Sequence, residues 1–84
     1  MIFLIEYDRR QGRVVTFRTF DNSARRKAED ERLEMELDLH RRGIVREVVL
    51  FEAATEAALR RTHRRYFPRR YFEDLADLVK LPAS

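Results

Sequence analysis

The chain contains no cysteine and no tryptophan, and only two residues each of glycine, proline and histidine. The lack of cysteine excludes a disulfide framework, a thiolate zinc site and an iron–sulfur cluster. No apolar run approaches the roughly 18 residues that a membrane-spanning helix needs. The charged N-terminal strand does not resemble a signal peptide, so we expect a soluble cytoplasmic protein with no membrane partner.

The length of 84 residues allows one domain at most. Leu, Ile, Val and Phe together contribute 24 residues, a share above the roughly 20 % below which disorder becomes the default. A chain this short buries only about 60–65 % of its unfolded surface when it folds. We therefore expect a small folded domain that still exposes apolar surface.

The charges are segregated along the chain, although 18 Lys and Arg against 15 Asp and Glu leave a net charge of only +3. Residues 29–38 contain six acids and one arginine, whereas residues 60–70 contain six arginines and no acid. A charged partner would respond to these local fields rather than to the net charge.

Two β-rich runs, residues 2–7 and 13–20, are separated by a short connection that ends in Gly12. This pattern predicts a β-hairpin, with Gly12 as the left-handed residue of a bulged type I turn. The predicted cross-strand pairs are Tyr7 with Val15, Ile5 with Phe17 and Phe3 with Thr19. One face is expected to carry Phe3, Ile5, Tyr7, Val15 and Phe17, and the other Ile2, Leu4, Glu6, Val14, Thr16 and Arg18.

Capping side chains at Asp21, Asn22 and Ser23 and a stop signal at Gly43 predict a helix over about 23–42. The stripe expected to face the sheet is Ala24, Ala28, Met35 and Leu39. Leu33 and Leu37 fall on nearly the opposite side. They are either two scattered exposed leucines, which are common, or a dimer surface.

The later part of the chain predicts one more strand and one more helix. Residues 44–51 are apolar on both faces, which is typical of a central strand. Thr55 is expected to cap a helix over about 56–67, which Pro68 interrupts. Residues 1–67 would form a single domain, and residues 68–84 an extension with a short amphipathic helix over 71–80 and a frayed end.

These elements predict an α+β fold in ββαβα order, a two-layer open-faced sandwich. Its three-stranded antiparallel or mixed sheet would have the strand order 2-1-3. The helices are expected to cover one face and to leave the other, partly apolar face exposed. Because three strands form a thin sheet, this predicts a homodimer. The candidate self-association residues are Leu33, Leu37, Ile2, Leu4 and Val14.

Residues 47–67, EVVLFEAATEAALRRTHRRYF, predict a strand, a threonine cap and a helix. This quarter of the chain resembles the strand-then-helix half of small ferredoxin-like domains in uncharacterised bacterial proteins. The resemblance implies an open-faced α+β sandwich that often pairs with a second copy. The resemblance implies no catalytic residue in this chain.

The segment around Pro68 contains a tandem repeat of two arginines followed by tyrosine and phenylalanine. Guanidinium groups bind phosphate oxygens, and aromatic rings stack on bases. The candidate residues for an anionic partner, a nucleic acid or an acidic protein, are Arg60, Arg61, Arg64, Arg65, Arg69 and Arg70. The alternative is a solvated helix face, because Tyr66 lies on the same side of the helix as Leu59 and so belongs to the core.

The acidic block over 29–38 has two interpretations. It is either a surface for those arginines or a set of local pairs between residues four apart. The expected local pairs are Arg25–Glu29, Arg26–Asp30 and Lys27–Glu31.

Catalysis finds little support in this sequence. It has no glycine-rich phosphate loop and no His-Glu-x-x-His pair. The only plausible acid–base pair is His63 with Glu52 or Glu56. We therefore predict a non-enzymatic binding or assembly module that self-associates, with no cofactor and no metal. The alternative function is nucleic-acid binding through residues 60–70.

Overall fold

The computed structural model describes residues 1–67 of the chain. Its elements are β1 (Ile2–Asp8), β2 (Arg13–Phe20), the 3-10 turn η1 (Asn22–Ala24), α1 (Arg25–Arg41), β3 (Glu47–Glu52), α2 (Glu56–Thr62) and the 3-10 turn η2 (Arg64–Tyr66). The predicted α+β class and ββαβα order are confirmed. The helix predicted over 71–80 lies outside the described residues, as do Arg69 and Arg70. No helix within residues 1–67 is long and apolar enough to cross a membrane.

The three strands form one antiparallel sheet in the order β2-β1-β3, which confirms the predicted strand order. β1 lies in the centre, and all but the last of its residues are buried. The prediction of a central strand over 44–51 is wrong, because β3 lies at an edge of the sheet. Its side chains are apolar on both faces because a helical layer covers each face, not because it has a strand on each side.

The hairpin follows the predicted register except next to its turn. The confirmed pairs are Ile5 with Phe17 and Phe3 with Thr19. Tyr7 pairs with Val14 instead of Val15, because a bulge shifts the register between Glu6 and Tyr7. The bulge exchanges the two valines: Val14 packs on the face of Tyr7, and Val15 is exposed. Gly12 has the expected left-handed conformation, with a φ of 66°.

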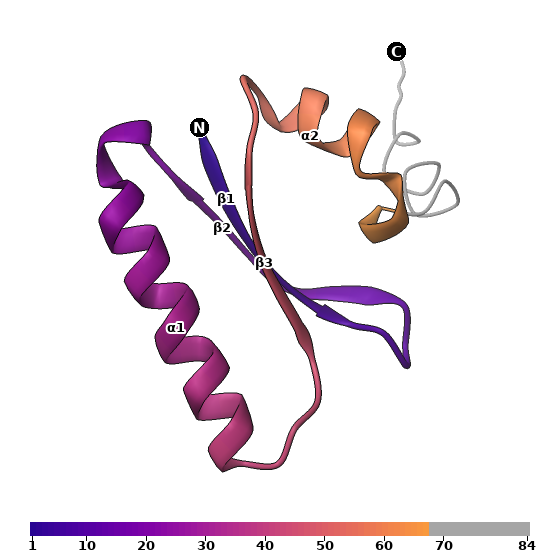
Figure 1. Cartoon of the computed structure of the whole chain (residues 1–84). Helices are drawn as coiled ribbons and strands as arrows, with labels where there is room; N and C mark the ends of the chain where they lie inside the picture. Colours follow the sequence, from indigo (N-terminus) through magenta and orange to yellow (C-terminus); the bar gives the residue numbers. More distant parts are fainter. Residues whose placement is uncertain (68–84) are drawn as a thin grey trace.

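Helices cover both faces of the sheet, so the prediction of a two-layer, open-faced sandwich is wrong (Figure 1). α1 packs on one face, where Ala28 and Leu39 contact a cluster that includes Ile2 and Leu4. α2 and η2 cover the other face. The residues of that second cluster are Phe3, Ile5, Tyr7, Leu59, Tyr66 and Phe67. Because successive side chains of β1 point to opposite faces and nearly all are apolar, both faces need a cover.

The second layer is built from less helix than predicted. α2 ends at Thr62 rather than continuing to residue 67, and the chain turns at His63 before η2. The hydroxyl of Thr62 donates to the carbonyl groups of Ala58 and Leu59 in the last turn. The break lets Tyr66 and Phe67 reach the sheet, where both are buried.

Three of the candidate self-association residues lie in the core. Ile2 and Leu4 are fully buried under α1, and Val14 packs in the cluster under η2. The expectation that they line an open face is therefore wrong. Leu33 and Leu37, in contrast, are 54 % and 48 % exposed on α1.

α1 begins after η1 instead of directly at the capping residues. The Asp21 carboxylate accepts hydrogen bonds from the backbone N–H and the hydroxyl of Ser23, and these bonds lower the pKa of Asp21. Asp21, one of the three predicted capping residues, thus caps η1, and α1 itself begins after Ala24 without a side-chain cap. At the other end Gly43, with a φ of 70°, stops the helix as expected.

Candidate functional site

Within residues 60–67, the part of the arginine segment that the structure describes, the arginines do not form one outward-facing surface. Arg60 donates from Nε and Nη2 to Glu56 at 2.8 and 2.6 Å. Its guanidinium carbon lies 4.5 Å from the centre of the Phe67 ring and 5.8 Å from that of Phe17. A guanidinium over an aromatic face is held by the negative potential of the ring. Arg60 therefore connects α2 to η2 and to the sheet.

Arg65 is also bound within the molecule, in a group of side chains that we name the Glu47 cluster: Tyr7, Glu47, Arg65 and Tyr66. Arg65 donates to both carboxylate oxygens of Glu47 at 3.1 and 2.9 Å, and the Tyr66 hydroxyl donates to Glu47 at 2.5 Å. The Tyr7 hydroxyl donates to the carbonyl of Arg65 at 3.3 Å. The cluster fixes η2 to β1 and β3.

The ionisation of the Glu47 cluster reflects these bonds. The hydrogen bond from Tyr66, followed by that from Arg65, lowers the pKa of Glu47. Burial, and then the hydrogen bond to the Glu47 carboxylate, raises the pKa of Tyr66. Both shifts favour the state in which Glu47 is charged and Tyr66 is neutral.

Arg61 and Arg64 point to solvent. The Nε of Arg64 donates to the carbonyl of Arg61 at 3.3 Å, and neither guanidinium has an acidic partner within residues 1–67. Of the four candidate arginines that the structure describes, Arg60 and Arg65 thus pair within the chain, although Arg65 stays exposed, and Arg61 and Arg64 are exposed without an acidic partner among residues 1–67. Tyr66 and Leu59 both lie in the core, as predicted.

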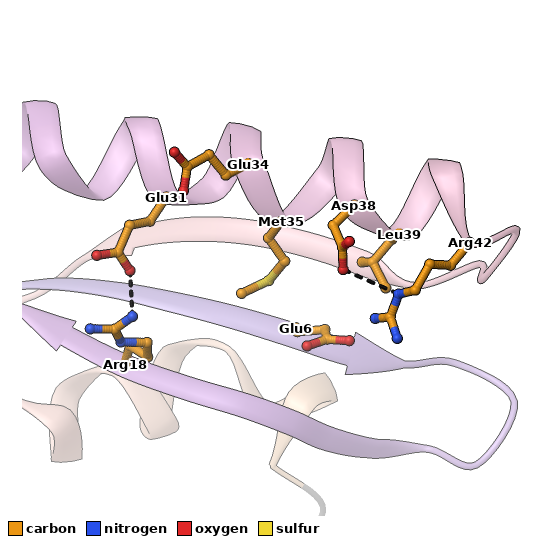
Figure 2. A pocket seen from close by; sticks show the side chains of 8 residues that line it. All are labelled: Glu6, Arg18, Glu31, Glu34, Met35, Asp38, Leu39 and Arg42. Carbon is orange, nitrogen blue, oxygen red and sulfur yellow. Dashed lines mark hydrogen bonds and ion pairs between the residues drawn. The ribbon is translucent and has the colours of Figure 1, made fainter.

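A groove of about 500 Å³ lies between α1 and the sheet (Figure 2). Its lining residues are Glu6, Arg18, Glu31, Glu34, Met35, Asp38, Leu39 and Arg42. Figure 2 shows an ion pair at either end, Arg18 with Glu31 at 2.5 Å and Arg42 with Asp38 at 3.1 Å. Met35 points from α1 into the space between them.

The floor of the groove is the carboxylate of Glu6, which is only 6 % exposed. It accepts hydrogen bonds from the Thr16 hydroxyl at 2.7 Å and from Arg46 at 2.5 Å, so both oxygens have protein partners. Glu6 is not among the candidate site residues that the sequence predicts. The available signal was a lone acid at an inward-facing position of an otherwise apolar strand, which requires a buried partner.

The candidate acid–base residues each have a different partner. The ring of His63 stacks on that of Phe51 with the centres 3.9 Å apart. Glu52 pairs with Arg25, and Glu56 pairs with Arg60. No group of three or more His, Asp or Glu residues within 1–67 could hold a metal ion.

The outer face of α1 carries Leu33 and Leu37 among charged residues. The local pair Arg26–Asp30 is confirmed at 3.6 Å. The other two expected local pairs are wrong, because one member of each reaches a strand. Arg25 binds Glu52 of β3, and Glu31 binds Arg18 of β2.

Comparison of the chain with family models, with curated proteins and with solved structures found no match. The resemblance of residues 47–67 to ferredoxin-like domains therefore stays a prediction. Any inference about function rests on the surfaces described above.

Proposed function

We propose that the protein is a non-enzymatic binding module that associates with a second copy of itself through the outer face of α1. The observation that carries this proposal is the exposure of Leu33 and Leu37, two large apolar side chains one helical turn apart. They lie on the side of α1 opposite to Ala28 and Leu39, which pack on the sheet. Since both faces of the sheet are covered, this stripe is what remains of the predicted self-association surface.

The proposal is tested by measuring the mass of the protein over a wide concentration range by sedimentation equilibrium. We expect a monomer–dimer equilibrium that Leu33→Glu and Leu37→Glu each shift toward monomer, with no loss of helicity by circular dichroism. Val45→Glu is the matched control, because Val45 is 85 % exposed and lies outside α1. A monomeric mass at every concentration would contradict the proposal.

A second candidate function is nucleic-acid binding, as the sequence also suggested, and it is favoured by the exposure of Arg61 and Arg64. Within residues 60–67 these two guanidinium groups are exposed and have no acidic partner. Two groups supply few phosphate contacts, so binding through them alone would be weak and strongly dependent on salt. Fluorescence anisotropy with a labelled RNA and a labelled DNA oligomer tests this candidate. Arg61→Glu with Arg64→Glu should abolish binding, whereas Arg26→Glu on α1 should leave it unchanged.

A further inference from the structure

The exposed side of α1 has the residue spacing of a coiled-coil seam. Asp30, Leu33, Leu37 and His40 follow one another at intervals of three, four and three residues. This alternation keeps side chains on one narrow stripe of a helix, where they can face a second helix. All four are exposed, and among residues 1–67 no helix or strand packs on the side of α1 that points away from the sheet (Figure 1).

We infer that two copies of the chain pack α1 against α1 in antiparallel orientation, about a two-fold axis near residue 35. The inference rests on the proposed self-association and names its geometry. In such a pair the leucines face each other at equal distances from the axis, and residues on one flank of the leucine stripe meet residues on the same flank of the second copy. Leu33 of each copy then contacts Leu37 of the second copy.

The charges beside the leucines favour this orientation. At about 100° per residue, Asp30 and Arg41 lie on one flank of the leucine stripe, and Glu29 and His40 lie on the other. In the antiparallel pair Asp30 of one copy faces Arg41 of the second, and Glu29 faces His40. The two contacts of Asp30 with Arg41 are ion pairs, and the two contacts of Glu29 with His40 each join a carboxylate to an imidazole.

The parallel orientation places like charges together at Asp30 and at Glu29, and its one opposite-charge contact joins Glu36 to Arg41 of the second copy. Asp30 would face its own copy, and Glu29 would lie beside Glu34 of the second copy. Like charges at such positions destabilise a helix pair. Asp30 and Arg41 are available for the antiparallel contacts, because their pairs with Arg26 and Asp38, at 3.6 and 3.8 Å, are exposed and such pairs are weak.

The antiparallel pair also contains an unfavourable contact. Glu34 and Glu36 lie close to the axis, so each approaches its own copy. Glu36 keeps a partner in Arg32 at 3.6 Å. A 17-residue helix is about 26 Å long, and one helix pair of this length lies at the small end of specific interfaces. The dimer is therefore weak and dependent on concentration.

The absence of cysteine from the chain makes disulfide cross-linking a direct test of the geometry. Asp30→Cys and Arg41→Cys are purified separately, and each is oxidised alone and as an equal mixture. The antiparallel pair brings residue 30 of one copy next to residue 41 of the other. Two copies of residue 30 are about 15 Å apart along the helices. Arg61→Cys on α2 gives the background from random collision.

We expect the mixture to give mainly the mixed dimer, identified by its intact mass, and each variant alone to cross-link no faster than the α2 control. Efficient cross-linking of each variant alone would overturn the antiparallel geometry and leave self-association intact. Cross-linking at the collision rate in every sample, together with a monomeric mass, would overturn both.

Discussion

The two helical layers attach to the sheet by different means. α1 is a long helix whose contacts with the sheet are mainly aliphatic. The layer of α2 and η2 has only a seven-residue helix and a three-residue turn, and its contacts are mainly aromatic. α1 is attached to the sheet through its inner side alone, so its outer side stays exposed. The short layer needs its own arginines and tyrosines to complete its packing.

The arginines show what this difference means for function. Arg60 and Arg65 bind carboxylates and aromatic rings of the same chain, so part of the positive charge of the second layer is already neutralised. On α1 the corresponding charges lie around an apolar stripe and can meet a second copy. A segment rich in arginine is thus not by itself a surface for anions.

The largest effect is expected from truncating the core of the short layer. Leu59 is the one buried residue of α2, and Leu59→Ala should lower the free energy of unfolding by about 3 kcal/mol. Amide protons of α2 should lose protection from exchange more than those of α1. Leu37→Ala, on the exposed side of α1, should change stability by less than about 0.5 kcal/mol. Denaturant unfolding measures both variants. Equal losses of unfolding free energy would contradict the difference between the two layers.

The next effect concerns the ion pair beneath the α1 layer. Arg46→Met leaves the buried carboxylate of Glu6 without its cation and should cost about 2–3 kcal/mol of unfolding free energy, somewhat less than for a fully buried pair. Adding Glu6→Gln to Arg46→Met should recover most of this loss. A double-mutant cycle in urea measures the coupling. If the double variant keeps the loss of unfolding free energy, then Arg46 stabilises the protein through packing rather than through its charge.

The Glu47 cluster predicts that the short layer depends on pH. In the folded protein the pKa of Glu47 is lowered from its ordinary value of 4.5. The charged Glu47 therefore stabilises the fold fully above about pH 4.5, and this stabilisation is lost as the pH falls through the folded pKa. The pKa of Tyr66 is raised above its ordinary value of 10.0. The neutral Tyr66 therefore stabilises the fold fully below about pH 10.0, and this stabilisation is lost as the pH rises through the folded pKa.

Thermal unfolding at a series of pH values tests this prediction. Glu47→Gln should flatten the acid side of the stability profile, and Tyr66→Phe the alkaline side. Glu52→Gln, which removes an exposed pair with Arg25, should leave the profile close to that of the parent. An acid side of unchanged slope in Glu47→Gln would show that the cluster does not hold η2 through charge.

The smallest effect is expected at the outer face of α1. Glu36→Gln removes one like-charge contact near the two-fold axis and should tighten the dimer about two- to threefold, the size of a surface charge interaction. Glu31→Gln removes the same charge on the side that faces Arg18, and it should leave association unchanged. Sedimentation at equal ionic strength distinguishes the two variants. A weaker dimer in Glu36→Gln would contradict the proposed geometry.

Local signals were sufficient for the order of the elements. The run of β-branched and aromatic residues, Gly12 and the caps near residue 21 and at Thr55 act over a few residues, and each produced the predicted element. The bulge after Glu6 was missed, because it depends on how Val14 packs in the second cluster and not on the turn alone. The candidate site was predicted in part: Leu33 and Leu37 are exposed, whereas Ile2 and Leu4 are buried.

The sequence by itself determined the strands, the helices and the two opposite stripes of α1, since these follow from residue spacing along one helix or strand. Only the tertiary structure decided that a second layer closes the sheet, that Glu6 is buried against Arg46, and that Arg65 binds the carboxylate of Glu47. For Glu6 and Arg65, the partners lie 40 and 18 residues apart in the chain. Which charges remain free for a partner therefore depends on contacts that no local pattern encodes.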